Sequence, residues 1–164
     1  MVRKMIEMAV AGGILLLTHF GLSSTSLRAS LVDVLGEQGF AGVYSLVALA
    51  ALGFVIWTYY TATRIDYFWF PNPDLYLLPK LLMPIAAMFA FGGFFVRNPT
   101  QTGRSDVLKQ DDFEAKGMMR ITRHPFMWGV LLWALTHIAA NGDAVSVVFF
   151  ATFGLLLKLV PTLP

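Results

Sequence analysis

Cysteine is absent from this sequence of 164 residues, and its absence removes several kinds of chemistry at once. Disulfide bonds, thiolate zinc sites, iron–sulfur ligation and cysteine nucleophiles all need a thiol. The sequence also has no glycine-rich phosphate loop, no Ser-His-Asp spacing and no HExxH motif. Any metal that this chain binds must therefore rely on histidine, methionine, tyrosine or carboxylate ligands.

Charged residues are also scarce. They make up 13% of the chain, whereas hydrophobic residues make up 57% and the mean hydropathy is +0.66. A water-soluble domain of this size does not need so many apolar residues to fill its core. The net charge is only +2, and the basic residues gather in connecting segments, unlike those of a nucleic-acid-binding surface. The composition predicts a membrane protein whose main partner is the lipid bilayer, and it argues against nucleic acid as a partner.

Five apolar segments are long enough, or nearly long enough, to cross a bilayer as helices. They are residues 5–22, 40–61, 75–96, 125–140 and 144–160. The fourth spans about 24 Å at about 1.5 Å per residue, so we expect the interior of a bundle to shield it from lipid. The sequence therefore predicts an all-α fold, a polytopic transmembrane helical bundle of about five spans, with residues 1–164 as a single domain.

Helix-breaking residues mark the boundaries of these segments. Gly36 and Gly39 precede the second segment, and residues 71–73 (Pro-Asn-Pro) precede the third. Pro125 fits the first position of the fourth helix, where its missing N–H costs nothing. The Asn-Gly-Asp sequence at residues 141–143 predicts a turn between the fourth and fifth helices, with Asp143 as a turn and cap residue.

The distribution of basic residues predicts the orientation in the membrane. Residues 97–123 form the one long polar segment, a loop with six basic and four acidic residues. Cytoplasmic connections normally collect lysine and arginine, so this loop should be cytoplasmic and the N-terminus outside. Residues 1–22 lack a small-residue cleavage pattern and are interpreted as a retained first span. The expected location is the bacterial inner (plasma) membrane, crossed several times.

Three histidines, His19, His124 and His137, lie within or at the edge of a predicted span. Ionisable groups are costly in a membrane, so each is a candidate functional residue, although a neutral imidazole can also simply bridge two helices. Two histidines from different helices can be the axial ligands of a haem. The expected positions of the histidines along the bilayer allow two axial pairs, His19 with His137 and His19 with His124.

Three arginines are candidate partners for haem propionates. Arg28 follows His19 and places a permanent cation near the interface, although it also fits snorkelling to lipid headgroups. Arg120 and Arg123 belong to the polar segment before Pro125. Arg123 and His124 lie at the positive N-terminal end of the fourth helix, a place that favours anions.

Trp133 precedes His137 by four residues, so the two side chains share one face of the fourth helix. An aromatic ring beside an imidazole fits the flank of a macrocycle, although packing between helices is the commoner use of such a pair. Trp133 is therefore a candidate cofactor-binding residue beside the candidate metal ligand His137.

Several of these motifs together resemble the NnrU family of bacterial membrane proteins. The matching positions extend over nearly the whole chain: His19 to Arg28, Gly36-Glu37, Tyr44-Ser45-Leu46, Thr122-Arg123-His124-Pro125, Trp133-Ala134-Leu135-Thr136-His137 and Asn141-Gly142-Asp143. The chain stops at Pro164, whereas relatives usually finish with a further helix and a basic tail, so we expect a form truncated at the C-terminus.

The resemblance implies a function as well as a fold. NnrU proteins are associated with nitrite and nitric oxide respiration, and they are similar to the plant ζ-carotene isomerase, a membrane haem b protein. This implies haem b as the cofactor, with His19 and His137 as its axial ligands. It also implies a link to denitrification or to redox-dependent cis–trans isomerisation of a polyene, with a hydrophobic small molecule or nitric oxide as the ligand.

Two other functions remain open from the sequence. The Arg123-His124-Pro125 motif also resembles membrane methyltransferases of the isoprenylcysteine and phospholipid type, in which it helps to bind S-adenosylmethionine. The acidic pair that those enzymes carry toward the C-terminus is absent here. The second alternative is a non-enzymatic accessory subunit of a respiratory complex.

Overall fold

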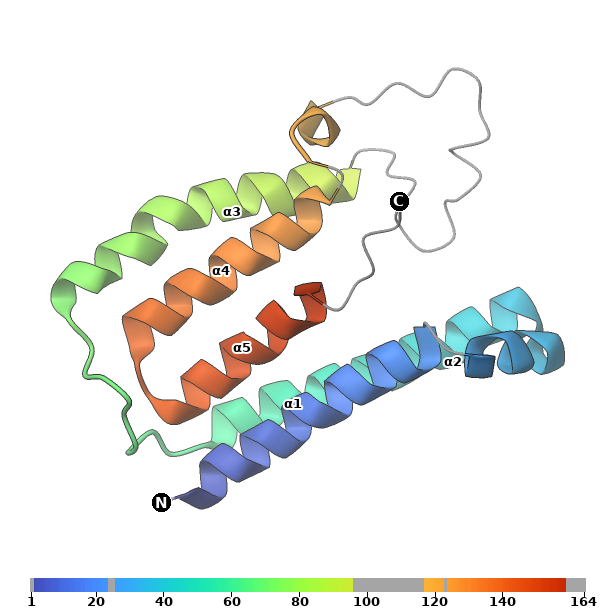
Figure 1. Ribbon diagram of the computed structural model, residues 1–164, viewed down its shortest axis with the longest axis horizontal. Helices are drawn as coiled ribbons and strands as arrows, with labels where there is room; N and C mark the ends of the chain where they lie inside the picture. Colours follow the sequence, from blue (N-terminus) through green and yellow to red (C-terminus); the bar gives the residue numbers. More distant parts are fainter. Residues whose placement is uncertain (1, 24–25, 96–116, 123, 159–164) are drawn as a thin grey trace. The chain divides into compact units, whose positions relative to one another are not determined.

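The computed structural model describes residues 2–23, 26–95, 117–122 and 124–158, and every regular element within these ranges is helical (Figure 1). The elements are α1 (Val2–Ser23), α2 (Ser26–Thr61), the 3₁₀ turn η1 (Pro73–Tyr76), α3 (Leu77–Phe95), the 3₁₀ turn η3 (Gly117–Arg120), α4 (Pro125–Asn141) and α5 (Ala144–Lys158). The all-α prediction is confirmed, with a helix for each of the five predicted segments.

Within the described residues, three stretches of helix are long and apolar enough to cross a membrane: Arg3–Ser23, Ser26–Thr61 and Pro73–Gly93. The helix α4 has 17 residues and α5 has 15, which is shorter than the roughly 20 residues that a lipid-exposed span needs. The chain is therefore a membrane protein by the length and composition of its helices. The predicted orientation and the bacterial inner membrane as its location stay predictions.

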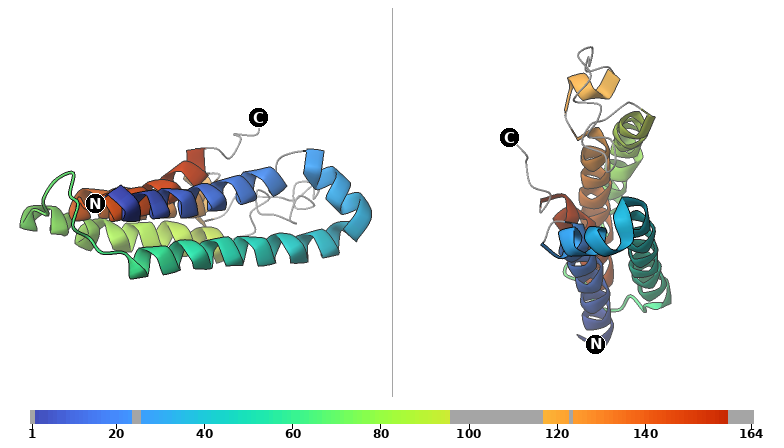
Figure 2. Two further views of the ribbon diagram at one scale, coloured as in Figure 1. Left: turned by 90° about the horizontal axis from the view of Figure 1, so that it is seen from below. Right: turned by 90° about the vertical axis from the view of Figure 1, so that its right-hand side faces the viewer.

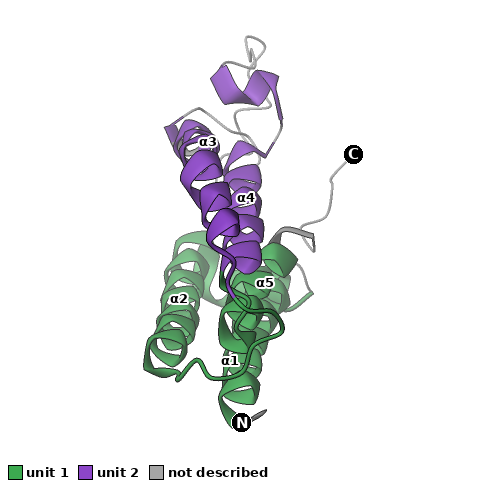
Figure 3. Cartoon of the chain, turned by 90° about the vertical axis from the view of Figure 1, so that its left-hand side faces the viewer, with its two compact units in different colours: residues 1–70, 141–164 green, residues 71–140 purple. Residues whose placement is uncertain are grey.

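The chain divides into two compact units (Figure 3). Unit 1 consists of residues 1–70 and 141–164, and unit 2 consists of residues 71–140. In unit 1, α1 packs against both α2 and α5, and α2 also contacts α5. The backbone at Gly12 lies against the Thr152 side chain, so a glycine is needed where α1 meets α5. The single domain over residues 1–164 stays a prediction.

A kink divides α2 at Gly36. The φ and ψ angles of this residue are 71° and 165°, a conformation that strongly favours glycine because it lacks a Cβ. The preceding residues 26–35 form a helical arm that bends away from the rest of α2 (Figure 2). The sequence correctly identified Gly36 as a breaker, but it did not predict that the residues before it are helical.

The turn before α5 is held against the segment that follows α2, within unit 1. The Phe68 N–H donates to the Gly142 carbonyl oxygen at 2.9 Å. Gly142 has a φ of 70°, and a Cβ at this position would collide with the Trp69 carbonyl oxygen. Asp143 Oδ1 accepts a hydrogen bond from the Ser146 N–H at 2.8 Å and caps α5. The predicted turn and cap role of Asp143 is confirmed.

Small residues hold α3 and α4 close together in unit 2. A Cβ built on Gly129 would lie 2.6 Å from the Ala86 carbonyl oxygen and 2.9 Å from the Ala90 Cβ. A Cβ on Gly93 would lie 2.5 Å from the Phe126 backbone nitrogen. Ala86, Ala90 and Gly93 are spaced so that they share one face of α3. Close backbone approach through small residues is a principal way of packing helices in lipid, where no hydrophobic effect drives their association.

Candidate functional site

His19 lies near the C-terminal end of α1, where its half-buried imidazole meets α2. A hydrogen bond of 2.9 Å joins its Nδ1 to the hydroxyl of Tyr44, and the two ring centroids are 5.9 Å apart. Phe20 presents its ring at right angles to the imidazole, with centroids 5.3 Å apart. The imidazole is therefore held in one orientation by a residue on the neighbouring helix.

The contacts continue from Tyr44 to the arm of α2. The ring of Phe40, which is only 7% exposed, stacks on Tyr44 with centroids 6.0 Å apart. The Arg28 guanidinium lies 5.3 Å from the centroid of Phe40 and forms an ion pair of 3.2 Å with Glu37. We call His19, Tyr44, Phe40, Arg28 and Glu37 the His19 cluster. The kink at Gly36 makes this cluster possible because it turns Arg28 back toward residues that follow it in the chain.

Arg28 is available to an external anion at small cost. The Arg28 side chain is 42% exposed and that of Glu37 is 70% exposed. An ion pair this exposed contributes at most about 1 kcal/mol, so another carboxylate can replace Glu37 with little loss. The structure thus supplies a partner for Arg28 that the sequence analysis did not name, and the assignment of Arg28 to a haem propionate stays a prediction.

His137 lies on α4, in unit 2. Its Nδ1 is 2.8 Å from the carbonyl oxygen of Trp133, one turn earlier. A carbonyl oxygen only accepts hydrogen bonds, so Nδ1 must carry the proton, and in the neutral ring Nε2 then carries the lone pair. The Trp133 and His137 ring centroids are 5.7 Å apart, which confirms that the two side chains share a face.

His124 occupies the position just before α4, as predicted. Its carbonyl oxygen accepts a hydrogen bond from the Trp128 N–H at 3.2 Å, and its own N–H donates to Thr122 Oγ1 at 3.3 Å. Pro125 is the first residue of α4 and is buried. His124 is therefore a helix-capping residue whose imidazole lies at the positive end of the helix.

The two histidines of unit 2 are too far apart to ligate one iron together. They are thirteen positions apart along α4 and its cap, or about 20 Å at about 1.5 Å per residue. Any axial pair with His137 therefore needs a histidine from elsewhere in the chain.

The predicted site residues are shared between the two units. Unit 1 holds His19 and Arg28, and unit 2 holds the remaining described members, which are Arg120, His124, Trp133 and His137. Arg120 is exposed at the end of η3, whereas Arg123 lies outside the described residues. The pairing of His19 with His137 thus joins two units and stays a prediction.

Within the described ranges no group of three or more His, Asp or Glu side chains could hold a metal ion. A haem does not need such a group, because the porphyrin supplies four nitrogens and the protein adds only axial ligands. Metal-bound histidines almost always donate their other ring N–H to a carbonyl, carboxylate or water. His137 makes this hydrogen bond to Trp133, and Nδ1 of His19 is hydrogen-bonded to the Tyr44 hydroxyl, which can accept its N–H when Nδ1 carries the proton. The donor chemistry of both residues therefore fits haem ligation.

Tyr44 is the residue that sequence reasoning missed as part of the site. The sequence analysis named Tyr44 only as part of the Tyr44-Ser45-Leu46 motif and assigned no contact to it. Phe40 and Tyr44 are four positions apart and so share a face of α2, which is the one local signal that the sequence offered.

Comparison with known proteins identifies the chain at the level of a family. No curated protein and no solved structure matches the chain. Among protein-family models, the one described as NnrU protein matches residues 7–161, which is nearly the whole chain.

Proposed function

Because the chain belongs to the NnrU family, we propose that it is a haem b-binding membrane protein of the NnrU type, with His19 and His137 as the axial ligands. The observation that carries this proposal is the hydrogen bond from His137 Nδ1 to the Trp133 carbonyl oxygen. It fixes the tautomer whose Nε2 can donate a lone pair to iron.

His19 supports the same proposal through Tyr44. If Nε2 of His19 ligates iron, Nδ1 keeps its proton. The Nδ1–H group then donates a hydrogen bond to the Tyr44 oxygen, at the observed distance of 2.9 Å. Phe40 packs behind Tyr44 and limits the movement of that ring. The ligand would therefore be oriented before the haem arrives, which lowers the entropic cost of binding.

The other predicted residues have roles that follow from their chemistry. Arg28 and Arg120 are exposed or half-buried cations suited to propionates, and Arg123 has the same role in the proposal. Trp133 would flank the macrocycle beside His137, and His124 would contact an anionic group at the start of α4. Haem b, when bound, would supply a redox-active iron, which suits a link to denitrification (nitrite and nitric oxide metabolism) or redox-dependent cis–trans isomerisation of a polyene.

The spectrum of the detergent-purified protein tests the proposal. We expect a Soret band and, after reduction with dithionite, sharp α and β bands, because two histidine ligands give a low-spin haem. A pyridine haemochrome assay should identify haem b at about one haem per chain. A featureless spectrum after expression with ample haem would contradict the proposal. Binding of S-adenosylmethionine would then favour the methyltransferase alternative, and its absence would favour an accessory subunit.

Replacing Tyr44 by phenylalanine tests the role of the His19 cluster. The variant keeps the ring stack with Phe40 but removes the hydrogen-bond acceptor of His19. We expect haem affinity to fall about tenfold, since such supporting contacts typically contribute 10–100-fold to metal binding. We also expect the midpoint potential to rise, because a ligand without this acceptor donates less charge to iron.

The matched control for this variant is Tyr60→Phe, because Tyr60 is also on α2 but is 83% exposed. An unchanged midpoint potential and haem affinity in Tyr44→Phe would show that Tyr44 does not position the ligand. Haem titration and potentiometry of both variants are the measurements.

A further inference from the structure

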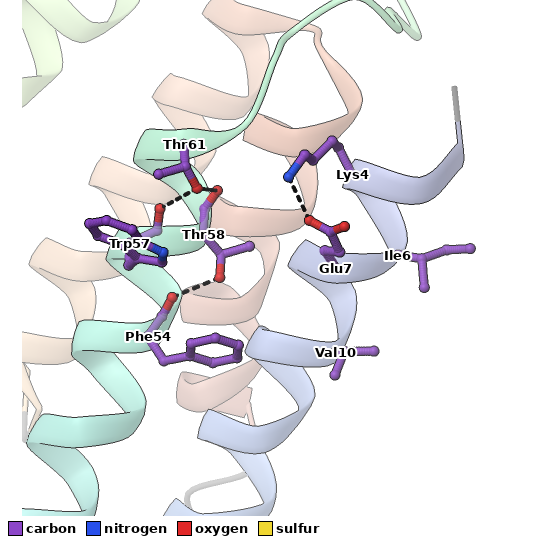
Figure 4. A pocket seen from close by; sticks show the side chains of 8 residues that line it. All are labelled: Lys4, Ile6, Glu7, Val10, Phe54, Trp57, Thr58 and Thr61. Atoms are coloured by element: carbon purple, nitrogen blue, oxygen red, sulfur yellow. Dashed lines mark hydrogen bonds and ion pairs between the residues drawn. The ribbon is translucent and has the colours of Figure 1, made fainter.

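An open groove of about 350 Å³ lies between α1 and α2, at the end of these helices away from His19 (Figure 4). Its lining residues come from the start of α1 and the end of α2: Lys4, Ile6, Glu7, Val10, Phe54, Trp57, Thr58 and Thr61. Lys4 and His19 are fifteen positions apart on α1, or about 22 Å. The groove is therefore separate from the His19 cluster.

The side of the groove formed by α2 is effectively apolar, although it includes two threonines. The Thr58 hydroxyl donates to the Phe54 carbonyl oxygen at 2.8 Å, and the Thr61 hydroxyl donates to the Trp57 carbonyl oxygen at 2.9 Å. Both hydroxyl hydrogens are thus used within the helix and are not offered to a ligand. The rings of Phe54 and Trp57, together with Val10 on α1, leave a surface suited to a hydrocarbon chain.

Positive charge gathers at the start of α1, where Lys4 and Glu7 line the groove and Arg3 binds Glu7. Glu7 accepts hydrogen bonds from Arg3 Nε at 2.9 Å and from Lys4 Nζ at 2.7 Å. One carboxylate thus faces two cations, and the three side chains together carry a net charge of +1. The Arg3 side chain is 89% exposed and that of Lys4 is 40% exposed, so both can reach a further anion. A singly charged phosphodiester would neutralise the set.

The order of these groups along α1 matches that of a phospholipid. The cations at Arg3 and Lys4 precede Val10 by about two turns, so charge lies about 9 Å above the apolar wall. The indole of Trp57 also lines the groove and is 66% exposed, and tryptophan is enriched at the level of the lipid headgroups. The cations at the start of α1 and the exposed indole both fit an anionic phospholipid.

We propose that this groove binds one anionic phospholipid, with an acyl chain against Val10 and Phe54 and the phosphate at Arg3 and Lys4. The lipid would fasten the first turns of α1 to the end of α2, where the helices otherwise leave space. This site is independent of haem, because the groove and the His19 cluster share no residue.

Native mass spectrometry of the full chain with phosphatidylglycerol tests the headgroup contact. We expect one saturable lipid and about fivefold weaker binding for Lys4→Gln, since a basic residue near a lipid surface contributes about 1 kcal/mol. Lys80→Gln is the matched control, because Lys80 is exposed on α3 and is not one of the residues that line the groove. Equal affinities of these two variants, or equal binding of phosphatidylcholine and phosphatidylglycerol, would overturn the proposal.

A second pair of variants tests the acyl-chain contact. Val10→Trp should fill the groove and reduce phosphatidylglycerol binding at least tenfold, whereas Leu17→Trp should leave it unchanged. Both positions are exposed on α1, at 53% and 75%, so neither substitution disturbs a packed core. Undiminished binding by Val10→Trp would show that the lipid lies elsewhere. The haem spectrum of these variants should be unchanged, which separates this result from any failure of the haem proposal.

Discussion

The His137→Ala variant should purify without the low-spin haem spectrum of the parent protein. The substitution removes the imidazole that the Trp133 carbonyl oxygen orients for ligation, and His124, just before α4, lies too far along the helix to replace it. The α and β bands of the reduced protein should disappear, and haem content should fall at least tenfold. Reduced-minus-oxidised spectra of detergent-purified protein, normalised to chain concentration, measure both effects.

The control for this experiment is His124→Ala. His124 caps the same helix through backbone atoms, which alanine retains, so the helix should still begin at Pro125. We expect weaker haem binding with the low-spin bands preserved, because His124 is assigned to an anion contact. If His137→Ala kept the bands and His124→Ala lost them, the two roles would be exchanged. If both kept them, neither residue would be an axial ligand.

The Gly129→Ala substitution should cause the largest loss of stability. The added methyl would meet the Ala86 carbonyl oxygen at 2.6 Å and the Ala90 backbone nitrogen at 2.7 Å, and neither can move without separating α3 from α4. We expect the free energy of unfolding to fall by about 3 kcal/mol, the upper part of the usual range for overpacking. Reversible unfolding in mixed detergent micelles with increasing dodecyl sulfate measures this quantity.

Gly53→Ala is the matched control, because it makes the same chemical change within a membrane-spanning helix. A Cβ on Gly53 would meet nothing within 4 Å, so stability should stay the same or rise slightly through the higher helix propensity of alanine. Equal stabilities of Gly129→Ala and Gly53→Ala would contradict the close packing of α3 on α4.

The sequence predicted the helices well because each depends on a local property. Apolar length located the five segments, Gly36 and Pro125 marked boundaries that the structure retains, and Asp143 was correctly assigned to the cap of α5. These signals act within a few residues of one another. The arm at residues 26–35 was missed because it is too short and too polar to resemble a span.

The contacts of the site were harder to predict because they join residues far apart in the chain. Tyr44 meets His19 across 25 positions, and Arg28 reaches Glu37 only because Gly36 turns the helix between them. Hydrophobic periodicity carries no information about which residue of one helix faces which residue of another. The groove at Lys4 was missed for the same reason, since its two walls come from opposite ends of α1 and α2.

The kink at Gly36 also bears on where the His19 cluster would lie relative to the bilayer. A straight helix with the 36 residues of α2 would extend about 54 Å, whereas the hydrocarbon layer is about 30 Å thick. We expect the arm to lie outside the hydrocarbon, and its Arg28 contacts would hold the His19 cluster at the same level. We therefore expect His19 to lie near the boundary between bilayer and water, on the side of the membrane where the arm lies.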